Sequence, residues 1–302
     1  INFFNSKIRL NWLVWTIVAC AVVFSVTGMV YYYVILDNTF TEMRLGYILK
    51  DGRHVWKELS VDILGTLTIP AMLFCFYLYR RASRLSYKIF LMIGAGIIFV
   101  ATILTQSRGT LTALIITGIV FLSIKNRKLL PLFLAGIVLV LIFSPYKNRI
   151  DAYTFSERIK INYVYLQAVR DYPLGGIGFG MRAYQENLDH KKYVQNVPDH
   201  LRPEGTLIGP HTWLLDIMVR TGIIGFLIFL LIIFVFLKMS WQVIRKARDS
   251  MIKDMGIYVS VAFLSYFIIG LAEPLFWATA PAMMFYILTA MMTVLWSWSR
   301  NE

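Results

Sequence analysis

The sequence predicts an all-α fold: a polytopic bundle of transmembrane helices with one large, partly helical loop outside the membrane. Of its 302 residues, 58% are hydrophobic and only 16% are charged, and the mean hydropathy is +0.63. One soluble core cannot bury that much apolar surface. In addition, long apolar blocks alternate with short charged connections, and a single polar stretch, 144–212, separates them. This polar stretch is the largest part of the chain that must lie in water.

Eight apolar blocks are candidate membrane spans. They are Trp12–Val34, Val61–Tyr79, Ile89–Thr105, Thr110–Ile124, Leu129–Phe143, Trp213–Leu237, Met255–Leu271 and Trp277–Trp298. Several are shorter than the roughly 20 residues of a full crossing, so we expect their helices to extend into flanking polar residues or to lie where the bilayer is thinned. We expect residues 1–302 to form one integral membrane domain, with further spans before Ile1 because the chain does not begin at methionine.

Basic residues crowd the short connections on one side of the predicted bundle. They are Lys7, Arg9, Arg80, Arg81, Arg84, Lys88, Lys125, Arg127, Lys128, Lys238, Arg245, Lys246, Arg248, Lys253 and Arg300. Short basic loops stay in the cytoplasm, so both visible ends are predicted to be cytoplasmic and the 144–212 loop to lie on the outer side. The net charge of +13 therefore reflects orientation and does not indicate a nucleic-acid partner. Basic residues within the long loop serve either solubility or an anionic ligand.

The long loop contains a predicted helix. Thr154 and Glu157 have the spacing of a capping box, and Pro173 ends the helical pattern. Arg158 would then lie in the first turn, where free backbone N–H groups help an arginine to bind phosphate. The alternative is a solvated arginine paired with Glu157 or Asp151.

A glycine-rich run, 175–180, follows this helix with the sequence GGIGFG. A dinucleotide-binding role fails because the run follows a helix-ending proline and not a strand. Gly176 and Gly178 instead predict a sharp turn and a close approach of the backbone to a neighbouring group.

Two charged residues lie near predicted span ends on the outer side. Arg108 occupies the tip between two apolar blocks, where it either binds a ligand or snorkels to lipid phosphates. Glu273 follows the seventh span, and an acid at that depth needs a partner. Arg108 and Arg220 are the two partners that the sequence suggests.

His211 precedes the sixth span, at the boundary between water and lipid, where a neutral imidazole can act as a base near neutral pH. A structural histidine is the alternative. His54, His190 and His200 lack metal-ligand spacing, so no metal site is expected. Two cysteines, both within apolar blocks, predict neither a disulfide framework nor a metal site.

Four stretches together resemble the superfamily of O-antigen ligases and polymerases, which are lipid-linked polysaccharide ligases of bacterial envelopes. The stretches are TQSRGTLTALIITG, ERIKINYVYLQAVRDYPLGGIGFG, PHTWLLDIMVRTGIIG and GLAEPLFWATAPAMMFYIL. The resemblance extends over residues 50–298. The order of the four stretches, the large loop between the second and third, and the predicted topology agree with this resemblance.

The resemblance implies a GT-C-like membrane glycosyltransferase of the bacterial inner membrane with a periplasmic active site. It implies metal-independent transfer of a glycan, without a cofactor, from an undecaprenyl-diphosphate donor to a hydroxyl acceptor. By motif match, Arg108, Arg158 and His211 are the catalytic residues, and both arginines bind the donor. We place Gly176, Gly178 and Glu273 with the substrate-binding residues. Where the family frequently has His-Asn, this chain has His211-Thr212.

Three functions remain open at this stage. A ligase would transfer the glycan to a sugar hydroxyl of the lipid A core, with inversion at the anomeric carbon. A polymerase would instead join two lipid-linked repeat units. A transporter or flippase would perform no covalent chemistry, although the paired interrupted helices of many transporters are not evident. His211 is either a general base or a protonated ligand of the diphosphate.

Overall fold

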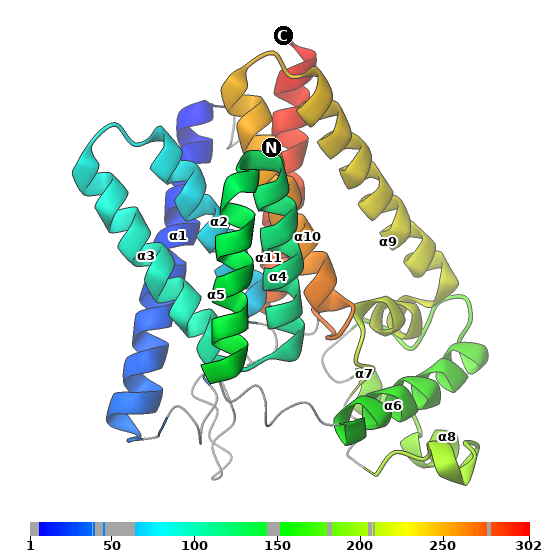
Figure 1. Ribbon diagram of the computed structural model, residues 1–302. Coiled ribbons are helices and arrows are strands. Elements are labelled where there is room, and N and C mark those ends of the chain that lie inside the picture. Colours follow the sequence, from blue (N-terminus) through cyan, green and yellow to red (C-terminus); the bar gives the residue numbers. More distant parts are fainter. Residues whose placement is uncertain are drawn as a thin grey trace. The chain divides into compact units, whose positions relative to one another are not determined.

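The computed structural model describes residues 6–37, 39, 45, 64–143, 152–179, 183–204, 207, 209–276 and 279–302, with the backbone alone for 152–155. Its described residues form helices and connections, without a strand among them (Figure 1). The predicted all-α, polytopic fold is confirmed. The chain divides into two compact units: residues 1–147, 236–269 and 278–302, and residues 148–235 and 270–277. We call them the helical bundle unit and the loop unit.

The bundle unit contains most of the long apolar helices. They are α1 (Lys7–Met29, continued as a π-helix by Val30–Ile35), α2 (Gly65–Arg81), α3 (Leu85–Leu104), α4 (Arg108–Lys125), α5 (Leu130–Phe143), α10 (Ser250–Gly270), α11 (Thr279–Arg300) and the part of α9 (Trp213–Lys246) from Phe236 onward. Each of the eight predicted blocks thus contains a helix. Six of these helices, including α1 with its extension, are long and apolar enough to cross a membrane; α2 and α5, with 17 and 14 residues, are shorter.

Most helices extend beyond the predicted blocks into charged residues. α3 begins at Leu85 and α10 at Ser250, while α9 continues to Lys246. The predicted ends fell where charges began, but Lys and Arg are good helix formers whose stems can lie along apolar surface. For α3 and α10, whose predicted blocks were short, this confirms the expectation that the helices extend into flanking polar residues.

Apolar side chains cover much of the outside of the bundle unit. On α5, Leu132, Val138 and Ile142 are more than half exposed, whereas α2 buries residues on all sides. Lipid is as apolar as these side chains, so an exterior of this kind is stable in a bilayer. α2 is accordingly a central helix of the unit and α5 a peripheral one.

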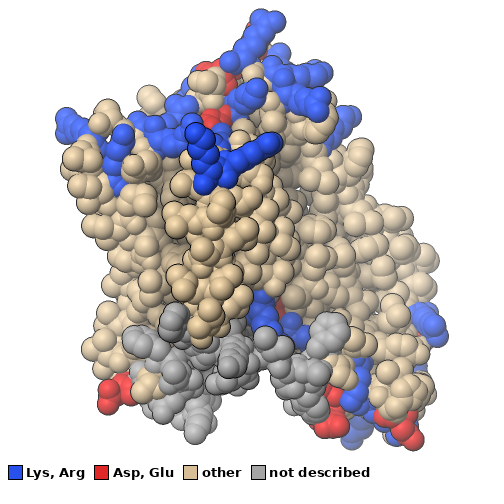
Figure 2. Space-filling model, in the orientation of Figure 1, with Lys and Arg blue, Asp and Glu red and all other residues tan. Residues whose placement is uncertain are grey.

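Basic residues gather at one end of the bundle unit (Figure 2). Contacts tie several connections together there: Lys7 pairs with Asp249, Lys125 pairs with Asp254, and Glu302 Oε2 accepts a hydrogen bond of 2.7 Å from the Arg248 backbone. The start of α1, the end of α4, the α9–α10 connection and the C-terminus therefore meet on one side. This grouping is the one that the positive-inside pattern predicts.

The loop unit is built around α6 (Ala152–Asp171). It also contains α7 (Ala183–Glu186), α8 (His190–Gln195), a 3₁₀ turn (Asp199–Leu201), the first part of α9 and the turn 271–276 that follows α10. One face of α6 buries Ile161, Tyr165 and Ala168 against α7, α8 and the start of α9. At its end, Asp171 Oδ2 accepts hydrogen bonds of 2.8 Å from Lys192 and Tyr193, and these bonds hold the pKa of the carboxyl below its ordinary value.

Gly222 interrupts α9 with a φ of 63°. The run after α6 supplies hydrogen-bond partners at this break: Ile177 and Gly178 N–H groups donate to the Val219 and Arg220 carbonyls, and Ile223 N–H donates to the Pro173 carbonyl. A Cβ on Gly176 would lie 2.3 Å from the Arg220 carbonyl carbon. The glycines thus permit a close approach of one backbone to another, as the sequence indicated.

Replacing Gly176 by alanine should disrupt this junction. Gly176 has a φ of 67° and no room for a Cβ, so the variant must adopt a strained backbone that costs about 1–3 kcal/mol and must also move the α9 segment. Gly175→Ala is the matched control, because a Cβ there meets nothing within 4 Å. Thermal unfolding in detergent should show a lower midpoint for Gly176→Ala alone. Equal midpoints for the two variants would contradict the account.

Candidate active site

An ion pair between α6 and the 271–276 turn lies at the centre of the candidate site. Arg158 Nη2 donates to Glu273 Oε1 at 2.7 Å, and Arg158 Nη1 donates to the Ala272 carbonyl at 3.1 Å. The Glu273 side chain is 10% exposed and that of Arg158 is 29% exposed. Glu273 does have a cationic partner, as expected. That partner is Arg158, whereas the sequence suggested Arg108 or Arg220. The guanidinium is held on one side by protein and remains partly open to solvent.

His211 lies beside the same carboxylate. Its backbone N–H donates to Asn162 Oδ1 at 2.8 Å, and its Nδ1 lies 3.9 Å from Glu273 Oε2. Nδ1 is buried and has no hydrogen-bond partner among the described residues, whereas 34% of the side chain is exposed. The imidazole therefore directs Nδ1 toward the protein while part of the side chain stays exposed.

An aromatic cluster holds the turn of Glu273 against the start of α9. Trp213 is fully buried, stacks on Phe276 with a centroid distance of 6.0 Å and meets Phe229 edge-on at 5.0 Å. A Cβ on Gly270 would lie 2.7 Å from the Trp213 ring, so only glycine fits there. Since His211 stands two residues before Trp213, this packing fixes the distance between the imidazole and the carboxylate.

Glu157 joins α6 to the segment that precedes His211. Its Oε2 accepts a hydrogen bond of 2.9 Å from the Glu204 backbone, and its Oε1 accepts one of 2.8 Å from Lys160 that raises the lysine pKa. The predicted helix start was wrong: α6 begins at Ala152, so Thr154 lies inside the helix and Arg158 in its second turn. The Thr154 side chain and Asp151, the other suggested partner of Arg158, lie outside what the structure describes.

Arg220 forms a separate buried pair within the loop unit. Its Nε donates to Asp216 Oδ1 at 2.8 Å, and Tyr184 OH donates to the same oxygen at 2.8 Å. The guanidinium lies 4.5 Å from the Tyr184 ring centroid, and burial together with Asp216 raises the pKa of that tyrosine. The side chains of Arg220 and Asp216 are only 4% and 1% exposed. This arrangement supports the segment on which Gly176 and Gly178 pack.

Arg108 belongs to the bundle unit. It is the first, exposed residue of α4, and Ser107 caps the helix by accepting a hydrogen bond of 3.3 Å from Thr110 N–H. Lys125 ends the same helix at the basic end of the unit, so Arg108 lies about 26 Å away at the opposite end. The predicted location at a helix tip agrees with this placement. Joint action of Arg108 with Arg158 stays a prediction.

Two participants were not singled out from the sequence. Asn162 lies four residues after Arg158, on the same face of α6, and this helical spacing was the available signal. Asp216 lies one turn before Arg220, which is also a readable i, i+4 pair. Within the described residues, no three His, Cys, Asp or Glu side chains gather to hold a metal ion.

Fold and site together define a class of protein: a multi-pass helical membrane protein with a helical loop unit that gathers Arg158, His211 and Glu273. Residues 93–230 match the family model described as O-antigen ligase. This match confirms the predicted resemblance to the superfamily of O-antigen ligases and polymerases. It includes Arg108, Arg158 and His211, and it ends before Glu273. No curated protein matches the chain.

Proposed function

We propose that this protein is a membrane glycosyltransferase that moves a glycan from an undecaprenyl-diphosphate donor to a sugar hydroxyl of the lipid A core. The observation that carries the proposal is the cluster of Arg158, Glu273 and His211 in a chain that matches the O-antigen ligase family. The cluster combines a fixed cation with a base beside a carboxylate, and both groups remain partly exposed.

The role of Arg158 is to bind the donor diphosphate. As the bond between the anomeric carbon and the diphosphate oxygen breaks, negative charge grows on the leaving group, and a positioned guanidinium stabilises it. The Ala272 carbonyl and Glu273 orient Arg158 before the donor arrives, which lowers the cost of ordering the side chain. Arg108, at the N-terminus of α4, supplies a second cation in this proposal.

The role of His211 is to deprotonate the acceptor. Nε2 takes the proton of the acceptor hydroxyl while its oxygen attacks the anomeric carbon, a new glycosidic bond forms, and lipid diphosphate leaves. Attack opposite the leaving group inverts the anomeric configuration. Glu273 stabilises the resulting imidazolium from the Nδ1 side, and the distance of 3.9 Å is compatible with a contact that tightens when substrate binds.

The site faces the periplasm of a bacterial inner membrane in this proposal. Support comes from the basic end of the bundle unit, because short basic connections stay in the cytoplasm. Arg108 lies at the other end of α4, and the long loop between α5 and α9 is translocated regardless of its own charge.

Cysteine labelling should report this orientation. With Cys20 and Cys75 replaced by serine, a cysteine at the exposed Gln195 should react with an impermeant maleimide added to the periplasmic side. A cysteine at the exposed Lys128, between α4 and α5, is the matched control and should react from the cytoplasmic side alone. Labelling of position 195 solely from the cytoplasm would overturn the topology together with the site assignment.

Purified protein tests the reaction itself. Undecaprenyl-diphosphate glycan is supplied in EDTA with either a lipid A core or a second lipid-linked unit, and the linkage of the product is determined by mass spectrometry and NMR. A glycan joined to the lipid A core with an inverted anomeric centre supports the proposal. A product that grows only from lipid-linked units would assign a polymerase, and unchanged connectivity with both acceptors would favour a transporter.

A further inference from the structure

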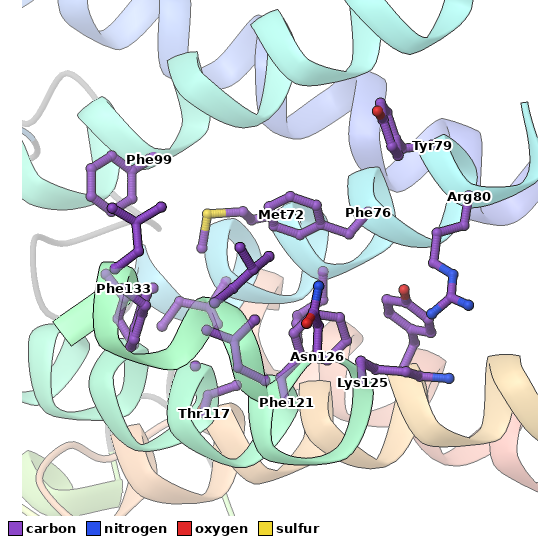
Figure 3. A pocket seen from close by; sticks show the side chains of 18 of the residues that line it. Met72, Phe76, Tyr79, Arg80, Phe99, Thr117, Phe121, Lys125, Asn126 and Phe133 are labelled. Carbon is purple, nitrogen blue, oxygen red and sulfur yellow. The ribbon is translucent and has the colours of Figure 1, made fainter. Parts of the chain in front are cut away.

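A cavity of about 710 Å³ opens within the bundle unit, apart from the candidate active site. It lies among α2, α3, α4 and α5, and its lining is mostly apolar and aromatic (Figure 3). Its volume falls within the roughly 300–1,000 Å³ of sites that bind small molecules. Because it lies between apolar helices of a membrane protein, the ligands within reach are lipids.

The two ends of this cavity differ in charge. Arg80 and Lys125 lie at one end, and Phe99 and Phe133 lie at the other (Figure 3). The basic pair belongs to the last turns of α2 and α4, where cationic residues gather at the end of the bundle unit. The cavity therefore suits a molecule with an apolar chain and an anionic headgroup.

The depth of the cavity corresponds to one leaflet. Its lining on α2 runs from Ile69 to Arg80, and on α4 from Leu114 to Lys125. Eleven residue steps along a helix span about 16 Å, close to half of the roughly 30 Å hydrocarbon core of a bilayer. A phospholipid acyl chain fills one leaflet, whereas a polyprenyl chain is longer than that.

The charges around the basic end favour an anion. Lys125 is paired with Asp254, and its Nζ lies 5.4 Å from the Tyr258 ring centroid. Arg80 is exposed, and Arg127 and Lys128 follow in the next connection. Asp254 offsets only one of these four cations, so a net positive charge remains for a lipid phosphate. Basic pockets between membrane helices at the cytoplasmic surface bind anionic lipid headgroups for this reason.

We propose that this cavity binds an anionic phospholipid of the leaflet at the basic end, with one acyl chain between α2, α4 and α5 and the phosphate at Arg80 and Lys125. The site is independent of the proposed glycan transfer. A bound lipid of this kind fills space between the central α2 and the peripheral α5, and so stabilises the bundle unit by binding only the folded state.

Lipid binding to the purified full chain tests the proposal. Native mass spectrometry and thermal unfolding in detergent compare phosphatidylglycerol with phosphatidylethanolamine of the same acyl chains, and undecaprenyl phosphate serves as a competitor. Phosphatidylglycerol should bind more tightly than phosphatidylethanolamine and raise the unfolding midpoint. In Arg80→Gln this preference should fall by about five-fold, the effect of one basic residue at a membrane surface.

Arg84→Gln is the matched control, because it removes the same charge at the same end of the unit from a residue outside the cavity lining. It should keep the wild-type preference. Met72→Trp fills the cavity and should weaken both phospholipids without changing their ratio. Equal binding of the two phospholipids by the wild type, an equal loss in Arg80→Gln and Arg84→Gln, or preferential binding of undecaprenyl phosphate would each overturn the proposal.

Discussion

Arg158→Ala should abolish most of the transfer activity. A fixed donor that meets charge developing on a leaving group contributes about 10²–10³-fold in rate, or about 2.7–4 kcal/mol in the barrier. Arg158 is also a partner of a nearly buried carboxylate, so its removal deletes the ion pair with Glu273 as well. Arg158→Lys should restore activity only in part, because an ammonium lacks the planar fork that contacts Glu273 and a diphosphate together. For both variants, the initial rate at saturating acceptor and the affinity for the donor are measured.

A control separates this catalytic loss from a loss of fold. Arg170→Ala removes an exposed arginine from the same helix, where its guanidinium donates a hydrogen bond of 3.1 Å to Gln167, and it should keep wild-type activity. Thermal unfolding shows whether Arg158→Lys is folded. Wild-type donor affinity and turnover in a folded Arg158→Lys and in Arg158→Ala would refute the proposed contact with the diphosphate.

His211→Ala should lower the rate by about 10²–10⁴-fold while donor binding is retained, because general-base catalysis contributes that much. Only a neutral imidazole accepts a proton, so a base in this role is lost when acid protonates it. The wild-type rate should therefore fall toward acid pH, and His211→Ala should lose this dependence. The exposed His200, replaced by alanine, is the matched control and should leave the pH–rate profile unchanged.

The pH–rate profile and donor binding in His211→Ala separate the base role from its rival. If His211 is the base, Glu273→Gln should also lower the rate, because the amide no longer stabilises the imidazolium. If His211 is instead a protonated ligand of the diphosphate, activity rises toward acid pH and His211→Ala weakens donor binding. A rate that increases toward acid pH, together with weak donor binding in His211→Ala, would lead us to abandon the base role.

The residues that sequence reasoning located best are those whose signal is local. Apolar blocks predicted eight helices, because a segment that crosses lipid must satisfy its backbone internally and expose apolar side chains. Arg158 and His211 were chosen as candidate site residues from motifs in the chain itself. The glycines at 175–178 indicated a close backbone approach, since only residues without a Cβ permit one.

Helix boundaries were less predictable, for a physical reason. Charged residues end an apolar pattern but not a helix, so α3, α9 and α10 run further than hydropathy alone suggests. The start of α6 was missed because the capping pattern at Thr154 competes with residues before it that are equally able to form a helix.

By itself the sequence determined an all-α membrane protein and the grouping of its basic connections, and it singled out Arg158 and His211 as candidate site residues. Tertiary structure alone decided that Glu273 is the partner of Arg158, although 115 residues separate them. It also placed the same carboxylate beside His211 through the packing of Trp213 on Gly270 and Phe276. Composition and spacing predict which segments enter the membrane, because membrane insertion depends on the hydrophobicity of each segment by itself. Contacts between distant segments depend on how side chains fill space together, which no local pattern contains.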